Sequence, residues 1–248
     1  MTEKRPFLYA LKFGIVIAIT AAIILGVGFL FTNHFESKKA TTPLPVFNKE
    51  DKIRFVIDPG HGGEDAGAIS GDGTLEKDLN LDIAVLLYTM LSLNGNEAVL
   101  TRETDTLLYN HFNDLTDYTG KKKVYDLKNR LKIAEENESS IYVGIHMNKF
   151  PLEKYSGLQV YYSQNTELSK SIANDVKNTV TTHLQPSNNR QIKSANSSIY
   201  ILHNAKIPAV LIECGFLSNQ QELSNLKNKD YQKNLALTLF ISLIKYGS

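Results

Sequence analysis

The hydrophobic and polar positions of this chain form one long apolar run followed by many short ones. Residues 13–31 carry no charged side chain, and a run of that length is enough for a helix to cross a bilayer. From residue 54 onward, short apolar runs alternate with stretches in which apolar residues recur at helical spacing. This pattern predicts a single α/β domain with a central, mostly parallel or mixed twisted sheet flanked by helices, preceded by one transmembrane helix.

The individual elements follow from the same pattern. The short apolar runs predict strands at residues 55–57, 98–100, 141–145, 157–162, 198–202 and 209–212. Helical spacing predicts helices over residues 74–95, 126–137, 168–184 and 231–245, with a further helical region after residue 218. Thr74 and Ser218 are the expected N-terminal caps, because hydroxyl side chains can accept hydrogen bonds from the first free backbone amides. Residues 106–124 are polar and predict a loop.

The long apolar run also predicts how the chain is organised around a membrane. Lys4, Arg5 and Lys12 precede it, which favours an N-terminus in the cytoplasm. We therefore expect a cytoplasmic tail at 1–12, a signal anchor at 13–31, a tether at 32–52 and a catalytic domain at 53–248. The predicted location is the cell membrane, with a single pass and an extracytoplasmic domain. A cleaved signal peptide is the alternative, but the run is long for one and no A-x-A-like cleavage site follows it.

Composition narrows the classes of function. The 248 residues carry a formal net charge of +1, which provides no electrostatic argument for nucleic-acid binding. Cys214 is the only cysteine, so an intramolecular disulfide is excluded. The stability of the domain must therefore come from packing, with a possible contribution from a metal.

Three of the predicted strands end in residues that bind metals or transfer protons. His61 stands in a glycine-rich turn after the strand at 55–57, and His146 and Glu213 follow two other apolar runs. In open α/β sheets, ligands bind beyond the carboxyl ends of the strands. Two histidines and a carboxylate are a ligand set of catalytic zinc, so His61, Glu76 and His146 are the candidate metal ligands. Zinc activates a bound water and polarises a carbonyl, and Glu213 is the candidate base for that water.

Two further residues follow strand ends and are candidates for substrate contact. Asn148 comes soon after His146, and Arg102 comes just after the strand at 98–100. Either residue can instead be structural, and Arg102 has Glu103 and Asp105 nearby as surface partners. Glu76 taken alone reads as an ordinary solvated helix residue. Glu213 is harder to explain in that way, because a carboxylate closing an apolar run is unfavourable unless it is paired or lies at a site.

Several motifs together resemble one known family. They are V-I-D-P-G-H-G-G at residues 56–63, L-E-K at 75–77, T-R at 101–102, G-I-H-M-N at 144–148 and I-E-C-G-F-L-S-N at 212–219. In this order they resemble the zinc-dependent N-acetylmuramoyl-L-alanine amidases of the Amidase_3 family, and the resemblance covers residues 53–246. It implies one zinc ion per domain, held by His61, Glu76 and His146, with Glu213 as the catalytic residue.

The resemblance also implies a substrate and a setting. The implied reaction is hydrolysis of the amide bond between N-acetylmuramic acid and L-alanine in peptidoglycan. Within the family, the chain is most similar to sporulation amidases, which implies a role in spore cortex maturation at the forespore envelope, through muramic-δ-lactam formation and germination. Besides peptidoglycan, the implied partners are a deacetylase that acts on the product and an accessory or activator protein.

Three other functions remain open from the sequence. One is an amidase of vegetative cell-wall turnover, and another is a zinc peptidase that cuts within the stem peptide. The third is a membrane-anchored wall-binding protein without catalytic activity. The last is disfavoured by Glu213, because a binding protein has no use for a base.

Overall fold

The computed structural model describes residues 52–247 of the chain. The predicted tail, the membrane span at 13–31 and the tether up to residue 51 lie outside these residues. Within residues 52–247, no helix combines the length and the apolar character that crossing a membrane requires.

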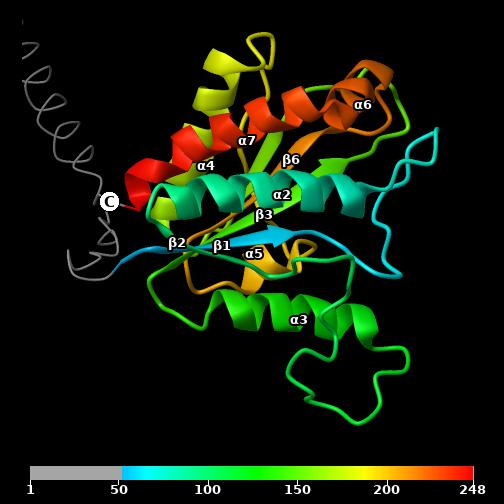
Figure 1. Cartoon of the computed structure of the whole chain (residues 1–248), viewed down its shortest axis with the longest axis vertical. Helices are drawn as coiled ribbons and strands as arrows, with labels where there is room; N and C mark the ends of the chain where they lie inside the picture. The colour runs from blue at the N-terminus through cyan, green and yellow to red at the C-terminus, as the bar shows by residue number, and fades with distance from the viewer. Residues whose placement is uncertain (1–51, 248) are drawn as a thin grey trace, which may run out of the picture. The chain divides into compact units, whose positions relative to one another are not determined.

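A six-stranded sheet forms the centre of the described domain, in the order β2-β1-β3-β6-β4-β5 (Figure 1). Strands β2, β1, β3 and β6 are parallel neighbours, whereas β4 runs antiparallel to β6, and β5 runs parallel to β4. The predicted mixed sheet of an α/β domain is therefore confirmed. The strands are β1 (Arg54–Pro59), β2 (Glu97–Leu100), β3 (Ser140–Asn148), β4 (Gln159–Tyr162), β5 (Lys193–Ser194) and β6 (Ala209–Phe216).

Helices cover both faces of the sheet, and each face has its own apolar core (Figure 1). Helices α2, α4 and α7 pack on one face, and α3 and α5 pack on the other. The helices are α2 (Glu76–Leu93), α3 (Lys122–Ala134), α4 (Glu167–His183), α5 (Tyr200–Asn204), α6 (Gln220–Lys227) and α7 (Lys229–Leu243), followed by the 3-10 turn η1 (Ile244–Tyr246).

The two cores explain why the central strands are apolar without interruption. In β1, Phe55 and Ile57 belong to the core under α2 and α7, whereas Val56 between them belongs to the core under α3 and α5. In β3, Val143 and Tyr142 divide between the two cores in the same way. Successive side chains of a strand point to opposite faces, so a strand covered on both faces is apolar at successive positions wherever it crosses the two cores.

Some local predictions were wrong. Residues 198–202, predicted as a strand, contain the start of helix α5, and the short strand beside β4 is instead β5. The cap of α2 is Leu75 and not Thr74, whose hydroxyl donates to Asp72. The cap of α6 is Asn219, one residue later than predicted.

Candidate functional site

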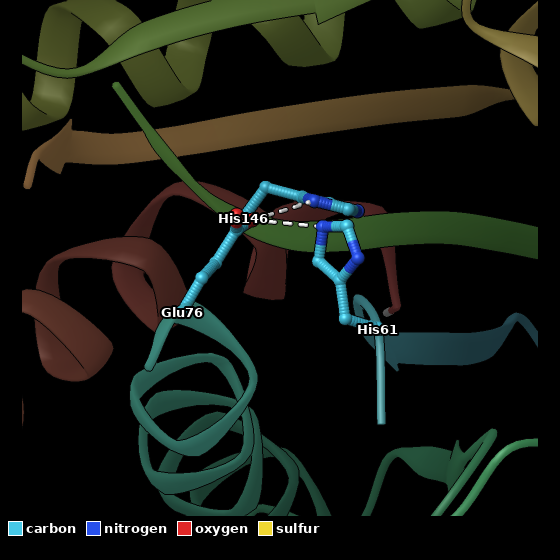
Figure 2. Close-up of side chains that lie close together, drawn as sticks. All are labelled: His61, Glu76 and His146. Carbon is cyan, nitrogen blue, oxygen red and sulfur yellow. Dashed lines mark hydrogen bonds and ion pairs between the residues drawn. The ribbon is translucent and has the colours of Figure 1, made fainter. Parts of the chain in front are cut away.

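Parallel strands β1, β3 and β6 bring three of the predicted site residues to one edge of the sheet. His61 follows the end of β1, and His146 lies near the end of β3. Glu213 lies on β6, directly across the ladder from His146. Glu76 is the first residue of α2, which begins at the same edge (Figure 2). Four residues that are far apart in the sequence therefore come from four different elements.

The two histidines and Glu76 meet at one carboxylate oxygen (Figure 2). Glu76 Oε1 lies 3.2 Å from His61 Nε2 and 3.1 Å from His146 Nδ1. One nitrogen or oxygen from each of the three residues can be chosen so that all lie within 4.8 Å of one another. Both imidazoles are about four-fifths buried, and Glu76 is 4% exposed. The three predicted ligands therefore form one compact, largely buried cluster.

The glycines around this cluster allow the backbone to approach the side chains closely. A Cβ atom on Gly60 would lie 2.1 Å from His146 Cε1, and one on Gly67 would lie 2.6 Å from Glu76 Oε2. His61 itself has φ 64°, an uncommon conformation for a residue with a side chain. Gly62 and Gly63, which follow His61, have φ 138° and 54°, and a Cβ atom on Gly62 would lie 2.2 Å from the Thr106 backbone oxygen, so the sequence H-G-G in the predicted turn is required by space and by backbone angles together.

The charges within the cluster depend on one another. Burial alone would raise the pKa of Glu76, but hydrogen bonds and charge interactions with His146 and His61 outweigh it and hold that pKa well below its usual value. Burial alone would lower the pKa of His61, but Glu76 and Asp65 raise it above its usual value. The Glu76 carboxylate is therefore favoured in its ionised form, and it favours a positive charge on the facing His61 ring.

This donor set fits zinc. Two imidazole nitrogens and one carboxylate oxygen are a ligand combination found in catalytic zinc sites, where three protein ligands leave a further position for water or substrate. Glu76 Oε2 accepts a hydrogen bond from the Ala68 amide at 2.7 Å, which fixes the carboxylate while Oε1 faces the histidines. The residues that would hold the ion are His61, Glu76 and His146.

Glu213 has the properties of a proton-transfer group beside this cluster. Its Oε2 atom is buried, and none of the residues 52–247 donates a hydrogen bond to it. Burial raises the pKa of Glu213 to about 7. A carboxyl group with a pKa near the working pH can both accept and return a proton.

Asn148 lies beside Glu213 at the end of β3. The two residues line a cavity of about 350 Å³ together with Tyr161 and polar residues near the start of α5. This position is compatible with the predicted contact between Asn148 and a substrate.

Arg102 follows β2, as predicted, and its contacts agree with the structural alternative. It is 3% exposed, and its guanidinium donates to the backbone carbonyls of Pro59, Gly60, Lys77 and Thr104 at 2.9 to 3.0 Å. Through these hydrogen bonds Arg102 holds the turn before His61 in place, and as a buried side chain it forms no surface pair with Glu103 or Asp105.

A second buried arginine supports the same turn and was not predicted from the sequence. Arg130 on α3 is 1% exposed and contacts the carboxylates of Asp58 at 2.5 Å and Asp126 at 2.7 Å. It also donates to the backbone oxygen of His61 at 2.6 Å. Two features of the sequence could have indicated this pair. Arg130 stands beside the apolar face of a predicted helix, and Asp58 directly follows the apolar run at 55–57.

The comparison with known families identifies one match over most of the chain. The model of the N-acetylmuramoyl-L-alanine amidase family matches residues 55–244. The germination-specific N-acetylmuramoyl-L-alanine amidase of Bacillus subtilis is 32% identical over 220 residues, covering 88% of this chain and 89% of the relative. The amidase LytC of the same organism is 31% identical over 194 residues, but the match covers only 35% of its length.

Solved structures agree with this comparison. The CwlD amidase from Clostridioides difficile, in complex with the GerS lipoprotein, is 38% identical with a TM-score of 0.72, covering 79% of this chain and 98% of that chain. The amidase AmiC2 of Nostoc punctiforme is 30% identical with a TM-score of 0.65, covering 79% of this chain and 97% of that chain.

Proposed function

Because the chain belongs to the N-acetylmuramoyl-L-alanine amidase family, we propose that it is a zinc-dependent hydrolase of the amide bond between N-acetylmuramic acid and L-alanine in peptidoglycan. The observation that carries this proposal is the meeting of His61, Glu76 and His146 at one point, with Glu213 directly across the ladder from His146. A wall-binding protein would need the fold but not the buried carboxylate of Glu213, whose Oε2 atom accepts no hydrogen bond from residues 52–247.

The roles of the residues follow from their chemistry. His61, Glu76 and His146 would hold the metal. Zinc, when bound, supplies a water of lowered pKa and a Lewis acid for the substrate carbonyl. Glu213 accepts a proton from the attacking water and returns it to the nitrogen of the departing alanine. Its raised pKa and buried position suit both halves of that transfer.

The cavity beside Glu213 offers space for the substrate. It is lined by Asn148, Tyr161 and Glu213, so a bound chain would lie next to the proton-transfer group. We propose that the side-chain amide of Asn148 forms a hydrogen bond with the substrate there, as donor or as acceptor. Replacing Asn148 with Ala should then raise KM more than it lowers kcat, because the amide binds the substrate and does not transfer protons.

The decisive experiment compares the wild-type protein with Glu213→Gln. The variant should bind zinc like the wild type, since Glu213 is not one of the three ligands, but should release stem peptides at least 100-fold more slowly, within the range expected for loss of a general base. Near-normal peptide release by this variant would refute the assigned role. In the same digest, free alanine amino termini identify an amidase, internal peptide termini a peptidase and new reducing ends a glycosidase.

We further propose that the amidase acts in maturation of the spore cortex, where a deacetylase would use its product to form muramic-δ-lactam. Support comes from the similarity to the germination-specific amidase of B. subtilis. Muropeptide mass spectrometry of spore cortex with and without this chain tests the proposal. Loss of muramic-δ-lactam is expected, whereas an unchanged cortex would favour a role in vegetative wall turnover.

The location and an accessory partner are part of the same proposal. Residues 13–31 would anchor the chain in the cell membrane, with the catalytic domain extracytoplasmic at the forespore envelope. Membrane fractionation and protease accessibility test this placement. Since the related C. difficile amidase was solved with a lipoprotein, an accessory protein is also proposed here, and co-purification from sporulating cells is its test.

A further inference from the structure

His61 contacts two carboxylates, one through each ring nitrogen. Nε2 lies 3.2 Å from Glu76 Oε1, on the side of the predicted metal. On the opposite side of the ring, Nδ1 lies 2.9 Å from Asp65 Oδ2. With a metal bound at Nε2, Nδ1 is the only ring nitrogen that can carry a proton, and the Asp65 carboxylate is placed to accept that proton's hydrogen bond.

The chain holds Asp65 firmly in this place. The backbones of Gly62 and Asp65 exchange two hydrogen bonds, each 3.0 Å long, which close a short loop directly after His61. The second carboxylate oxygen of Asp65 accepts from the Gly67 amide at 3.3 Å. The loop therefore orients Asp65 towards the ring from both its backbone and its side chain.

The contact distinguishes the two histidines of the cluster. His146 faces Glu76 through Nδ1, and within residues 52–247 no other carboxylate lies in hydrogen-bond range of its ring. Only the His61 ring is thus fixed by a charged group outside the cluster. Metal-bound histidines commonly donate their other ring N–H to such a carboxylate, which sets the tautomer and strengthens the ligand.

We propose that Asp65 is a positioning residue of the metal site, which sets the tautomer and orientation of His61 and thereby raises the affinity for zinc. This inference rests on the proposed zinc site and adds to it a residue that does not touch the metal. Removing such a partner commonly lowers metal affinity by about 10- to 100-fold.

The rival explanation is that Asp65 only connects the loop to α3. Its Oδ2 atom lies 3.5 Å from Lys123 Nζ, and the Lys123 side chain is 71% exposed. An exposed ion pair of this length contributes little. Lys123→Met removes this link and leaves the His61 contact intact, so it separates the two explanations.

The experiment measures the zinc affinity of the full-length chain, purified in detergent and stripped of metal, by competition with a chromophoric chelator. Asp65→Ala should bind zinc about 10- to 100-fold more weakly than the wild type. Asp65→Asn keeps an oxygen that can accept the hydrogen bond and loses only the charge, so its loss should be smaller. Thermal unfolding in the presence of a chelator checks that each variant is folded, and Asp65→Asn keeps the test open should Asp65→Ala fail to fold.

Two controls bracket the result. Glu64→Gln changes the neighbouring acid, which pairs with Lys122 and does not touch a ligand. Both Glu64→Gln and Lys123→Met should bind zinc within threefold of the wild type.

In a His61→Ala background, Asp65→Ala should have no further effect on zinc affinity, because Asp65 acts through the His61 ring. Long-range proton–nitrogen NMR should locate the His61 proton on Nδ1 in the zinc-loaded wild type.

The outcomes are distinct. Wild-type zinc affinity in Asp65→Ala and Asp65→Asn would overturn this inference and leave the proposed function intact. An equal loss in Lys123→Met would assign Asp65 to the loop and overturn the inference as well. Failure of the wild-type chain to bind zinc would refute the proposed function itself.

Discussion

The buried Arg130 offers the sharpest test of how the fold supports the site. Arg130→Met keeps a long, flexible side chain of similar shape and removes the charge. Asp58, which is 1% exposed, would then lose its arginine partner, and the His61 carbonyl would lose its donor from α3. Burial alone would raise the pKa of Asp58, but the Arg130 charge and hydrogen bonds from Thr101 and Tyr142 hold it below its usual value.

The expected magnitude follows from this burial. Removing one partner of a buried ion pair destabilises a protein by about 3–5 kcal/mol, because the remaining charge is left without compensation. That is a large part of the roughly 5–15 kcal/mol by which a domain is stable. For a domain of this size, about 2–4 °C of melting temperature is lost per kcal/mol, so the midpoint should fall by roughly 6–20 °C.

The assay is urea and thermal unfolding of the metal-free protein at neutral pH. Lys233→Met is the control, because its ion pair with Asp230 joins side chains that are 61% and 86% exposed and should contribute at most about 1 kcal/mol. Asp58→Asn combined with Arg130→Met should be less destabilising than the sum of the two single changes, since it removes one of the two buried carboxylates, Asp58 and Asp126, that Arg130→Met leaves without their partner. Arg130→Met with a stability within about 1 kcal/mol of the wild type would refute the reasoning.

Three other outcomes are expected. Because burial raises the pKa of Glu213 from 4.5 to about 7, the folded protein holds this proton more tightly than the unfolded chain, and metal-free stability should fall by about 3 kcal/mol between those pH values. Urea unfolding at pH 5 and pH 7 should show that the free energy of unfolding of Glu213→Gln changes much less between these pH values than that of the wild type. An equal change in both proteins would contradict the assigned pKa. Gly67→Ala should weaken zinc binding at least 10-fold in chelator competition, because its Cβ would lie 2.6 Å from Glu76 Oε2 in a backbone of φ 67°. Cys214 is buried and its thiol pKa is raised, so a thiol reagent should modify it in urea but not in the native protein; rapid native labelling would argue against that burial.

The elements of this fold differed in how well the sequence predicted them. The strands that became β1, β3 and β6 were clear because each is covered on both faces and is therefore continuously apolar. Residues 198–202 have the same apolar character and were predicted as a strand, yet helix α5 begins at Tyr200. A run this short does not distinguish helical from strand periodicity, so packing of Ile201 and Leu202 against the sheet decides between them.

The residues of the candidate site also differed in how well the sequence predicted them. Four of them stood out because each follows an apolar run or lies in the first turn of a predicted helix, and because the motifs around them resemble one family: His61, Glu76, His146 and Glu213. The role of Arg102 was not predictable, since the sequence places it after a strand but does not specify the carbonyls that surround it. Asp65 and Arg130 were missed for the same reason, as both act on the turn that carries His61 through contacts within the folded chain.

The sequence by itself determined the alternation of strands and helices, the candidate metal-binding and proton-transfer residues, and the family. These depend on side-chain chemistry and on periodicities that are local in the chain. Only the tertiary structure decided which charged groups are buried, which backbone oxygens they hold and which nitrogen of His61 faces Glu76. Those properties arise from contacts between segments far apart in the chain, and a buried charge is stable only where such contacts compensate for the water it has lost.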